Sequence, residues 1–229
     1  SDTDADDINI QGARFIPNSF FGTVTHVNTD STIGLLRHLN INTVVINFRW
    51  PVLEHDRGDY AFSGERNDGR GNWMIDSADL GAKNGLDQVA LLDQCPPWAQ
   101  GERGTYPNDD SVEALEETAY RIALKYKGKI RYWLANNEPD MSVWKDRYIV
   151  FLKAFYKGIK RANPENKVLL AGFAGFEAQH LEAVYRLGGK DYFDILTSHP
   201  YTRPRRPEGA FLELLEANYR VMRKYGDDK

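Results

Sequence analysis

The chain has 229 residues, of which 41% are hydrophobic and 27% charged, a balance typical of a globular protein with one large domain or two small ones. A formal net charge of −4 argues against nucleic acid or an anionic membrane as the main partner, and no apolar run approaches the roughly 18 residues of a membrane span. The single cysteine, Cys95, excludes an internal disulfide framework and a cysteine-based zinc site.

Residues 1–17 are expected to form an acidic, flexible leader, because they open on S-D-T-D-A-D-D and chain termini of this kind fray. The chain shows no N-terminal signal peptide and does not begin with Met. A mature secreted chain and an artificial chain boundary would both begin in this way. The compartment therefore stays open, with a secreted or periplasmic location slightly favoured.

From residue 19 onward one unit repeats, a β-rich apolar run followed by a helix-like segment. The expected strands are, in chain order, 19–27, 43–50, 87–94, 130–137, 167–173 and 193–199. The first helix, 31–40, has Asp30 or Ser31 as its expected N-cap, and the helix at 72–85 is stopped by Asn84-Gly85. Four later helices follow the third to sixth strands, and the last of them stops at Gly226.

Strict alternation of strands and helices leaves a closed (β/α)8 barrel or a doubly wound open sheet. No strand is followed by G-x-G-x-x-G or G-x-x-x-x-G-K-[ST], so the nucleotide-binding open sheets lose their main support. Polar or aromatic residues instead follow nearly every strand: His26, Asn28, Arg49, Trp50, Asp93, Trp98, Asn137, Glu138, Glu177, His199 and Tyr201. We therefore predict an α/β fold of the (β/α)8 TIM-barrel type, with residues 18–229 forming a catalytic domain of about six βα units.

Four motifs together resemble the retaining glycoside hydrolases of clan A, with families 39 and 5 the most similar. W-L-A-N-N-E-P (133–139) resembles the acid/base motif at the fourth strand. R-W-P-V-L-E-H-D-R-G-D-Y-A-F (49–62) resembles the loop after the second strand, although His55 stands where the family often has Pro. C-P-P-W-A (95–99) is similar to the Pro-Trp turn after the third strand, and S-H-P-Y (198–201) to the His-x-Tyr motif ending the sixth. The similarity covers about residues 19 to 225 and points to a clan more than to a substrate.

This resemblance implies hydrolysis of O-glycosidic bonds, as in polysaccharide degradation, by a retaining double displacement that needs two carboxyl groups about 5–5.5 Å apart. Glu138 matches the general acid/base, and Asn137 matches the residue that hydrogen-bonds the sugar 2-OH. Arg49 and Tyr201 would contact the nucleophile carboxylate, and His199 would hydrogen-bond near the same centre. The remaining candidates for contact with the carbohydrate are Trp98, Trp50 and His26. No cofactor is expected, and the five histidines show no metal-ligand spacing.

Each assignment has a structural alternative. Glu138 could instead interact with the N-terminus of the following helix. Arg49 could form a salt bridge at the barrel mouth, and His199 could be a structural histidine. Trp50 and Trp98 either stack on a sugar or only cap the barrel.

Three further features carry weaker interpretations. Glu54 is expected to be a loop residue. The stretch R-P-R-R-P at 203–207 is a solvated loop or, in a minority interpretation, a binder of acidic sugars such as uronates. Lys129 and Lys167 lie at strand beginnings, away from the catalytic end, which sets aside a Schiff-base lyase or aldolase.

The nucleophile of the family, a Glu at the end of the seventh strand, has no counterpart in this sequence. Six units occupy about 205 residues, and eight would need about 300. We expect the rest of the barrel to lie outside these residues, or a second polypeptide to close it, or the fold to be a compacted variant, in that order. Asp93 and Glu177 are poor substitutes, because their strands adjoin that of Glu138 instead of facing it. The rival interpretation is a catalytically silent barrel that binds carbohydrate or forms part of an assembly.

Overall fold

The computed structural model describes residues 22–25, 28–63, 72–101, 106–141, 145–174, 178–201 and 206–229. Six parallel strands form one sheet in the order of the sequence. They are β1 (Gly22–Val24), β2 (Thr43–Arg49), β3 (Asp87–Asp93), β4 (Tyr132–Ala135), β5 (Lys167–Leu170) and β6 (Ile195–Leu196). The expected leader, His26, Glu177 and most of the R-P-R-R-P stretch lie outside the described residues.

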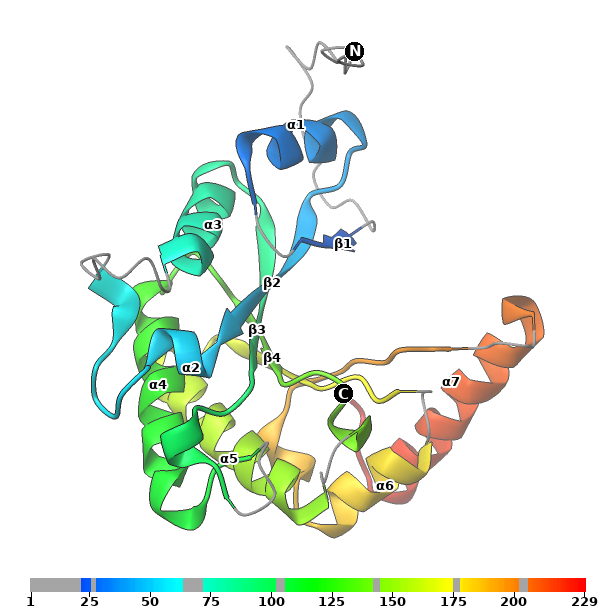
Figure 1. Ribbon diagram of the computed structural model, residues 1–229. Helices are drawn as coiled ribbons and strands as arrows, with labels where there is room; N and C mark the ends of the chain where they lie inside the picture. Colours follow the sequence, from blue (N-terminus) through cyan, green and yellow to red (C-terminus); the bar gives the residue numbers. More distant parts are fainter. Residues whose placement is uncertain are drawn as a thin grey trace, which may run out of the picture.

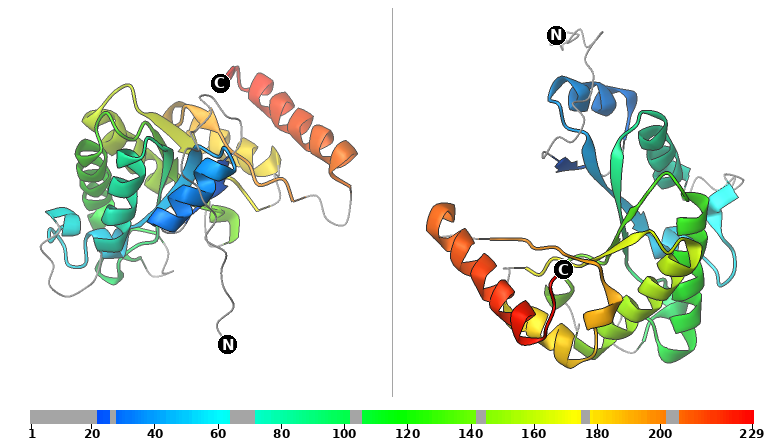
Figure 2. Two further views of the ribbon diagram at one scale, coloured as in Figure 1. Left: turned by 90° about the horizontal axis from the view of Figure 1, so that it is seen from above. Right: turned by 180° about the vertical axis from the view of Figure 1, so that it is seen from behind.

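Helices connect successive strands and follow the last one. They are α1 (Asp30–His38), α2 (Trp50–Leu53), α3 (Asn72–Lys83), α4 (Val112–Lys125), α5 (Lys145–Ala162), α6 (Ala178–Arg186) and α7 (Pro207–Lys224). Figure 1 shows the sheet curled into an arc with the long helices along its convex side. The right view of Figure 2 shows α1 near one end of the arc and α7 near the other. This curled sheet, a partial (β/α)8 barrel, confirms the predicted fold class.

The ends of two helices show how local sequence sets the boundaries. Thr29 caps α1, because its extended backbone lets its hydroxyl accept the backbone N–H of Thr32 at 3.1 Å. The prediction of Asp30 or Ser31 as N-cap is therefore wrong by a residue or two. The helix α3 ends as predicted, since Gly85 has a φ of +71°, a left-handed conformation that glycine adopts without steric cost.

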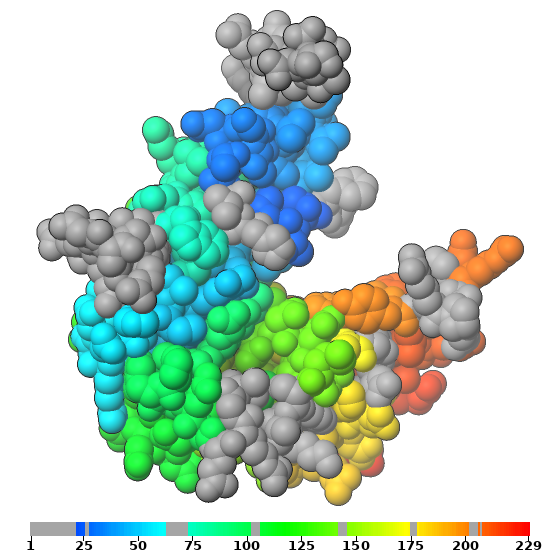
Figure 3. All heavy atoms as spheres, viewed as in Figure 1, coloured from blue at the N-terminus to red at the C-terminus, as the bar shows by residue number. Residues whose placement is uncertain are grey.

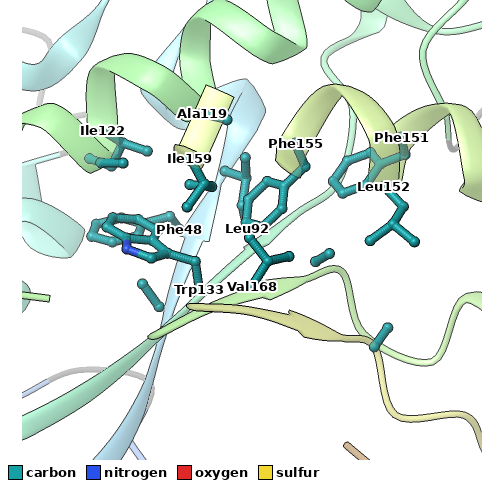
Figure 4. Packing of buried hydrophobic residues seen from close by; sticks show 14 of the residues in the cluster. Phe48, Leu92, Ala119, Ile122, Trp133, Phe151, Leu152, Phe155, Ile159 and Val168 are labelled. Carbon is teal, nitrogen blue, oxygen red and sulfur yellow. The ribbon is translucent and has the colours of Figure 1, made fainter. Parts of the chain in front are cut away.

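The main core lies between the convex face of the sheet and the helices, chiefly α4 and α5 (Figure 4). β2 buries every second side chain on this face, and its Phe48 ring stacks on Trp133 of β4 with centroids 6.5 Å apart. Phe155 and Ile159 of α5 are fully buried in the same cluster. Truncating a buried ring of this kind to alanine costs about 3–5 kcal/mol. This packing fixes the strands from one side and leaves their other face to the site.

The concave face carries an apolar layer with a polar layer beyond it. The apolar layer consists of three leucines in register on adjacent strands, Leu91, Leu134 and Leu169. Two residues beyond this layer, Arg49 and Asp93 are in register at the carboxyl ends of β2 and β3. Because side chains alternate between the two faces of a strand, Asp93 lies on the same face as Leu91. The carboxyl edge of the concave face is therefore where the polar groups gather.

Candidate active site

The segments that follow β4 and β6 meet at the carboxyl edge of the sheet. Parallel strands all end at one edge, so residues far apart in sequence come together there. Glu138 follows β4, and its side chain contacts His199 and Tyr201, which follow β6 and lie 61 and 63 positions away along the chain. In Figure 3 the lime-green atoms after β4 and the orange atoms after β6 lie on the same face of the molecule. The structure thus brings together three of the residues that the motifs singled out.

The carboxyl group of Glu138 receives both of these neighbours on one oxygen. The Tyr201 hydroxyl donates to Oε1 at 2.6 Å, and Nδ1 of His199 lies 2.7 Å from the same atom. The hydrogen bond from Tyr201 is the largest cause of a pKa of Glu138 below its usual value, and His199 adds to it through a hydrogen bond and its charge. Partial burial acts in the opposite direction without reversing the shift. In this arrangement Glu138 is a stabilised carboxylate.

The backbone of the Glu138 turn is strained. Asn136 and Glu138 have φ values of +73° and +43°, in the left-handed region that side chains other than Asn, Asp and Gly seldom adopt. Backbone hydrogen bonds hold the turn on both sides: Asn136 N–H donates to Leu92 O at 3.0 Å, and Glu138 N–H donates to Gly172 O at 3.1 Å. β4 is shorter than the sequence predicted because the chain leaves the strand conformation at Asn136, although these bonds keep the turn attached to the neighbouring strands. Strain of this kind at a strand end is typical of functional sites.

Asn137 lies between these two residues of positive φ. Its backbone N–H donates to Oδ1 of Asn136 at 2.6 Å, and the residue is exposed. The contact of its side chain with a sugar hydroxyl stays a prediction.

Arg49 and Asp93 form a second polar group at the edge, on the neighbouring strands β2 and β3. Burial raises the pKa of Asp93, while a hydrogen bond of 3.3 Å from Asn47 and the positive charge of Arg49 act against the increase. Oδ1 of Asp93 and Oδ1 of Asn47 are buried without a hydrogen-bond partner among the described residues. The exposed Arg49 therefore acts electrostatically on Asp93, while Glu138 is stabilised by Tyr201 and His199.

The two tryptophans near the edge differ in exposure. Trp50 is 0% exposed, and its indole N–H donates to Oε2 of Glu54 at 2.8 Å. Its ring meets Trp98 edge-on, with centroids 5.7 Å apart and an interplanar angle of 82°. With no exposed face, Trp50 cannot stack on a sugar in this structure, and the alternative that it walls the barrel fits its burial. Trp98 is half-buried and keeps part of its surface accessible.

Glu54, which we expected to be a loop residue, lies just after α2 as its C-cap, and it is fully buried, which the sequence did not predict. Its Oε2 accepts hydrogen bonds from Trp50 and from the hydroxyl of Thr118 on α4, and its Oε1 accepts the backbone N–H of Gly58 at 2.8 Å. The carboxyl group thus joins the segment after β2 to α4. The spacing of Trp50 and Glu54, four residues apart on a helical turn, is the only hint of this role in the sequence.

The described part of the chain contains neither a reactive thiol nor a group of side chains arranged to bind a metal ion. Cys95 is buried, and burial raises the pKa of its thiol to about 12, which removes the thiolate nucleophile at neutral pH. No three His, Cys, Asp or Glu side chains of the described ranges are grouped so that they could hold a metal ion. None of the described helices combines the length and the apolarity that crossing a membrane requires.

Several solved structures with a similar fold are glycoside hydrolases. A family 39 glycoside hydrolase from the gut symbiont Bacteroides cellulosilyticus WH2 matches with a TM-score of 0.66 and 19% identity, over 82% of this chain and 39% of that chain. An endoglucanase from Pseudomonas stutzeri matches with a TM-score of 0.59 and 14% identity, over 95% and 71%. A family 30 subfamily 8 xylanase from Clostridium acetobutylicum matches with a TM-score of 0.60 and 16% identity, over 90% and 52%.

These likenesses concern the fold. No protein-family model matches the chain, and no curated protein matches its sequence. The chain spans 39% of the length of the family 39 hydrolase and about half of the family 30 xylanase. At the level of the fold, the neighbours confirm the resemblance to barrel glycoside hydrolases of families 39 and 5 that the motifs predicted.

Proposed function

We propose that the chain acts in the hydrolysis of O-glycosidic bonds of a carbohydrate by a retaining double displacement, with Glu138 as general acid/base. The observation that carries this proposal is the contact of Glu138 with His199 and Tyr201 at the carboxyl edge of the sheet, where (β/α)8 enzymes hold their catalytic groups. The nucleophilic carboxyl group would come from a segment outside this sequence or from a second chain.

In the first step the Glu138 carboxyl group would protonate the glycosidic oxygen as the bond to the anomeric carbon breaks and the nucleophile attacks that carbon. In the second step the Glu138 carboxylate would take a proton from the water that releases the sugar from the nucleophile. Both donors contact Oε1, so Oε2 is the oxygen available to carry the transferred proton. Asn137 would bind the sugar 2-OH, and the exposed part of Trp98 would contact a ring.

The acid form of Glu138 requires a change in its surroundings. With Tyr201 and His199 on Oε1 its pKa is lowered, and no carboxyl group is among the described neighbours that shift it. A second carboxylate placed nearby would raise the pKa through like-charge repulsion. The proposal therefore links the acid role of Glu138 to the presence of the nucleophile.

The test is Glu138→Gln, made in a protein in which the segment or second chain that carries the nucleophilic carboxyl group is present. The variant is assayed on two kinds of substrate. For glycosides with poor leaving groups, loss of the general acid is expected to lower kcat on the order of 10²- to 10⁴-fold. Aryl glycosides whose phenolate leaves without protonation should lose much less in their first step. Equal losses on both kinds of substrate would contradict the acid/base role. Glu165→Gln is the matched control and should leave both rates unchanged. It changes an exposed carboxylate in the loop before β5, at the opposite end of the strands from Glu138.

A second candidate function is carbohydrate binding without turnover. The observation in its favour is the same pair of donors on Glu138, because a carboxylate held ionised binds sugar hydroxyls but donates no proton. Calorimetric titration with oligosaccharides separates the two. A silent barrel would bind oligosaccharide and release no product even with the closing segment present, whereas the hydrolase would convert it.

A further inference from the structure

The segment Gly172–Ala174, directly after β5, lies between the Glu138 turn and the segment of His199. On one side Gly172 O accepts the backbone N–H of Glu138 at 3.1 Å. On the other side Ala174 forms a parallel β-bridge with His199. Glu138 and His199, whose side chains meet at 2.7 Å in the site, are thus both placed by this one stretch of backbone.

Gly172 is in direct contact with the ring of His199. A Cβ added at Gly172 would lie 2.5 Å from Cδ2 and 2.8 Å from Nε2 of that ring, closer than real side-chain contacts allow. The φ of Gly172 is outside the left-handed region, so the backbone itself would accept alanine. What requires glycine at this position is the imidazole ring.

The contact fixes the plane of the imidazole ring beside the carboxyl group. An added Cβ would lie 2.5, 2.8 and 3.1 Å from Cδ2, Nε2 and Cγ, which places it over the face of the ring, while Nδ1 lies 2.7 Å from Oε1 of Glu138. With Glu138 ionised, this geometry requires the proton on Nδ1, so that the nitrogen donates to the carboxylate. A side chain at position 172 would push the ring away from this alignment.

Asp140 ties the same stretch to the Glu138 turn. Both oxygens of its carboxyl group lie within hydrogen-bond distance of the backbone N–H of Ala174, at 3.0 and 3.1 Å, and its side chain is 7% exposed. Nδ1 of His180 on α6 lies 3.5 Å from Oδ2 of Asp140. A strained turn persists only where its surroundings over-determine it, and this second bond adds to that of Glu138 N–H.

We propose that Gly172 is a positioning residue of the site, whose missing side chain places the His199 ring with Nδ1 on Glu138. This inference rests on the proposed role of Glu138 for its meaning in catalysis, but the geometry can be tested without turnover. Asp140 supports the arrangement by holding Gly172–Ala174 against the Glu138 turn.

The test uses the 229-residue chain with three variants: Gly172→Ala, His199→Ala and the double variant. Carbon-13 NMR of the side-chain carboxyl groups follows the titration of Glu138. Gly172→Ala is expected to raise the pH midpoint of the Glu138 titration (the Glu138 midpoint) by as much as His199→Ala does. Both changes remove the hydrogen bond from His199 and keep that from Tyr201. In the double variant the midpoint should equal that of His199→Ala alone. A folded Gly172→Ala variant with an unchanged Glu138 midpoint would overturn the proposal, and so would additive shifts in the double variant.

Folding of the variants gives an independent readout. If Gly172→Ala does not fold, the double variant should recover the fold, because removal of the ring vacates the space that the new Cβ needs. Failure of the double variant to fold, with His199→Ala folded, would show that the conflict is not with the ring and would refute the inference. Gly209→Ala on α7, where an added Cβ meets no atom within 4 Å, is the matched control and should leave the Glu138 midpoint unchanged.

Where turnover can be measured, Gly172→Ala is expected to lower kcat for poor leaving groups by up to about 100-fold, as misplacement of a catalytic group by about 1 Å can do. The NMR titration separates this proposal from the proposed function. If the midpoint shifts but the protein shows no turnover even when the segment or chain that carries the nucleophile is present, the positioning role stands and only the hydrolase is contradicted.

Discussion

Replacing Glu54 with leucine is expected to loosen the segment that follows β2 from α4. Glu54 is fully buried and accepts three hydrogen bonds, from Trp50, Gly58 and Thr118. Leucine fills a similar volume but leaves these three donors without their acceptor. The wall formed by Trp50 and Trp98, beside Arg49, depends on this carboxyl group.

The magnitude follows from the donors left behind. A buried donor that loses its acceptor costs about 1–3 kcal/mol. The cost is smaller at Gly58, because this residue is exposed and its N–H can donate to water instead. We therefore expect Glu54→Leu to lower the free energy of unfolding by roughly 3–5 kcal/mol, a large share of the 5–15 kcal/mol typical of a domain. Glu54→Gln keeps an oxygen for Trp50 and Thr118 but turns an NH2 group toward the Gly58 N–H, which should cost about 1–2 kcal/mol.

Urea denaturation followed by tryptophan fluorescence measures these differences as shifts in midpoint at constant slope. Thr118→Val removes one donor, so in a double-mutant cycle with Glu54→Leu the two losses should be less than additive by about 0.5–3 kcal/mol. The exposed loop change Glu165→Gln is the control and should stay within about 0.5 kcal/mol of the parent. A Glu54→Gln variant as stable as this control, or fully additive losses in the cycle, would refute the reasoning.

Two further predictions concern titration. Tyr201→Phe removes the largest cause of the lowered pKa of Glu138, so the pKa should rise in a carbon-13 titration. A carboxyl group whose pKa is lowered by folding stabilises the fold at pH values above its pKa in the unfolded chain, and this contribution is lost as pH falls through its pKa in the folded chain. The variant should therefore be less stable than the parent at neutral pH and equally stable in acid. An equal loss of stability at both pH values would count against this account. Asp93→Asn should raise the free energy of unfolding at neutral pH by roughly 0.5–2 kcal/mol. Burial raises the pKa of Asp93, so the parent loses stability as pH rises through the pKa of Asp93 in the folded chain, and a neutral asparagine avoids this loss. The gain should vanish below about pH 4, where the parent is protonated as well, and a variant less stable than the parent at pH 7 would contradict it.

The sequence predicted most of what depends on periodicity. Short apolar runs alternating with amphipathic segments fix a parallel sheet, and a parallel sheet brings all strand ends to one edge. That logic alone places Glu138, His199 and Tyr201 near one another, and the structure joins them by hydrogen bonds. The strand lengths were harder to predict. β4 stops at Ala135 because Asn136 turns into a left-handed conformation, which the apolar run before it does not reveal.

Features that depend on single contacts between distant segments escaped prediction. Glu54 is buried because Thr118, 64 positions away, supplies a donor, and this burial takes the Trp50 ring out of reach of a ligand. Tyr201 was expected on the nucleophile and in the structure it donates to Glu138. Gly172 went unnoticed because the absence of a side chain acquires meaning only once the His199 ring is placed against it. Periodicity predicts which edge holds the site, but not which atoms meet there.

The two donors on Glu138 differ in how firmly they are held, and this difference determines how the site can become an acid. The His199 ring lies against Gly172, whereas Tyr201 is 63% exposed. A second carboxylate arriving at the edge would therefore draw Tyr201 to itself more readily than His199. Glu138 would then lose the largest cause of its lowered pKa and gain the repulsion of a negative charge, and both changes raise its pKa. On the proposed function, Glu138 thus becomes able to protonate a leaving group only once the nucleophile is in place, while His199 keeps Oε1 oriented and leaves Oε2 facing the substrate.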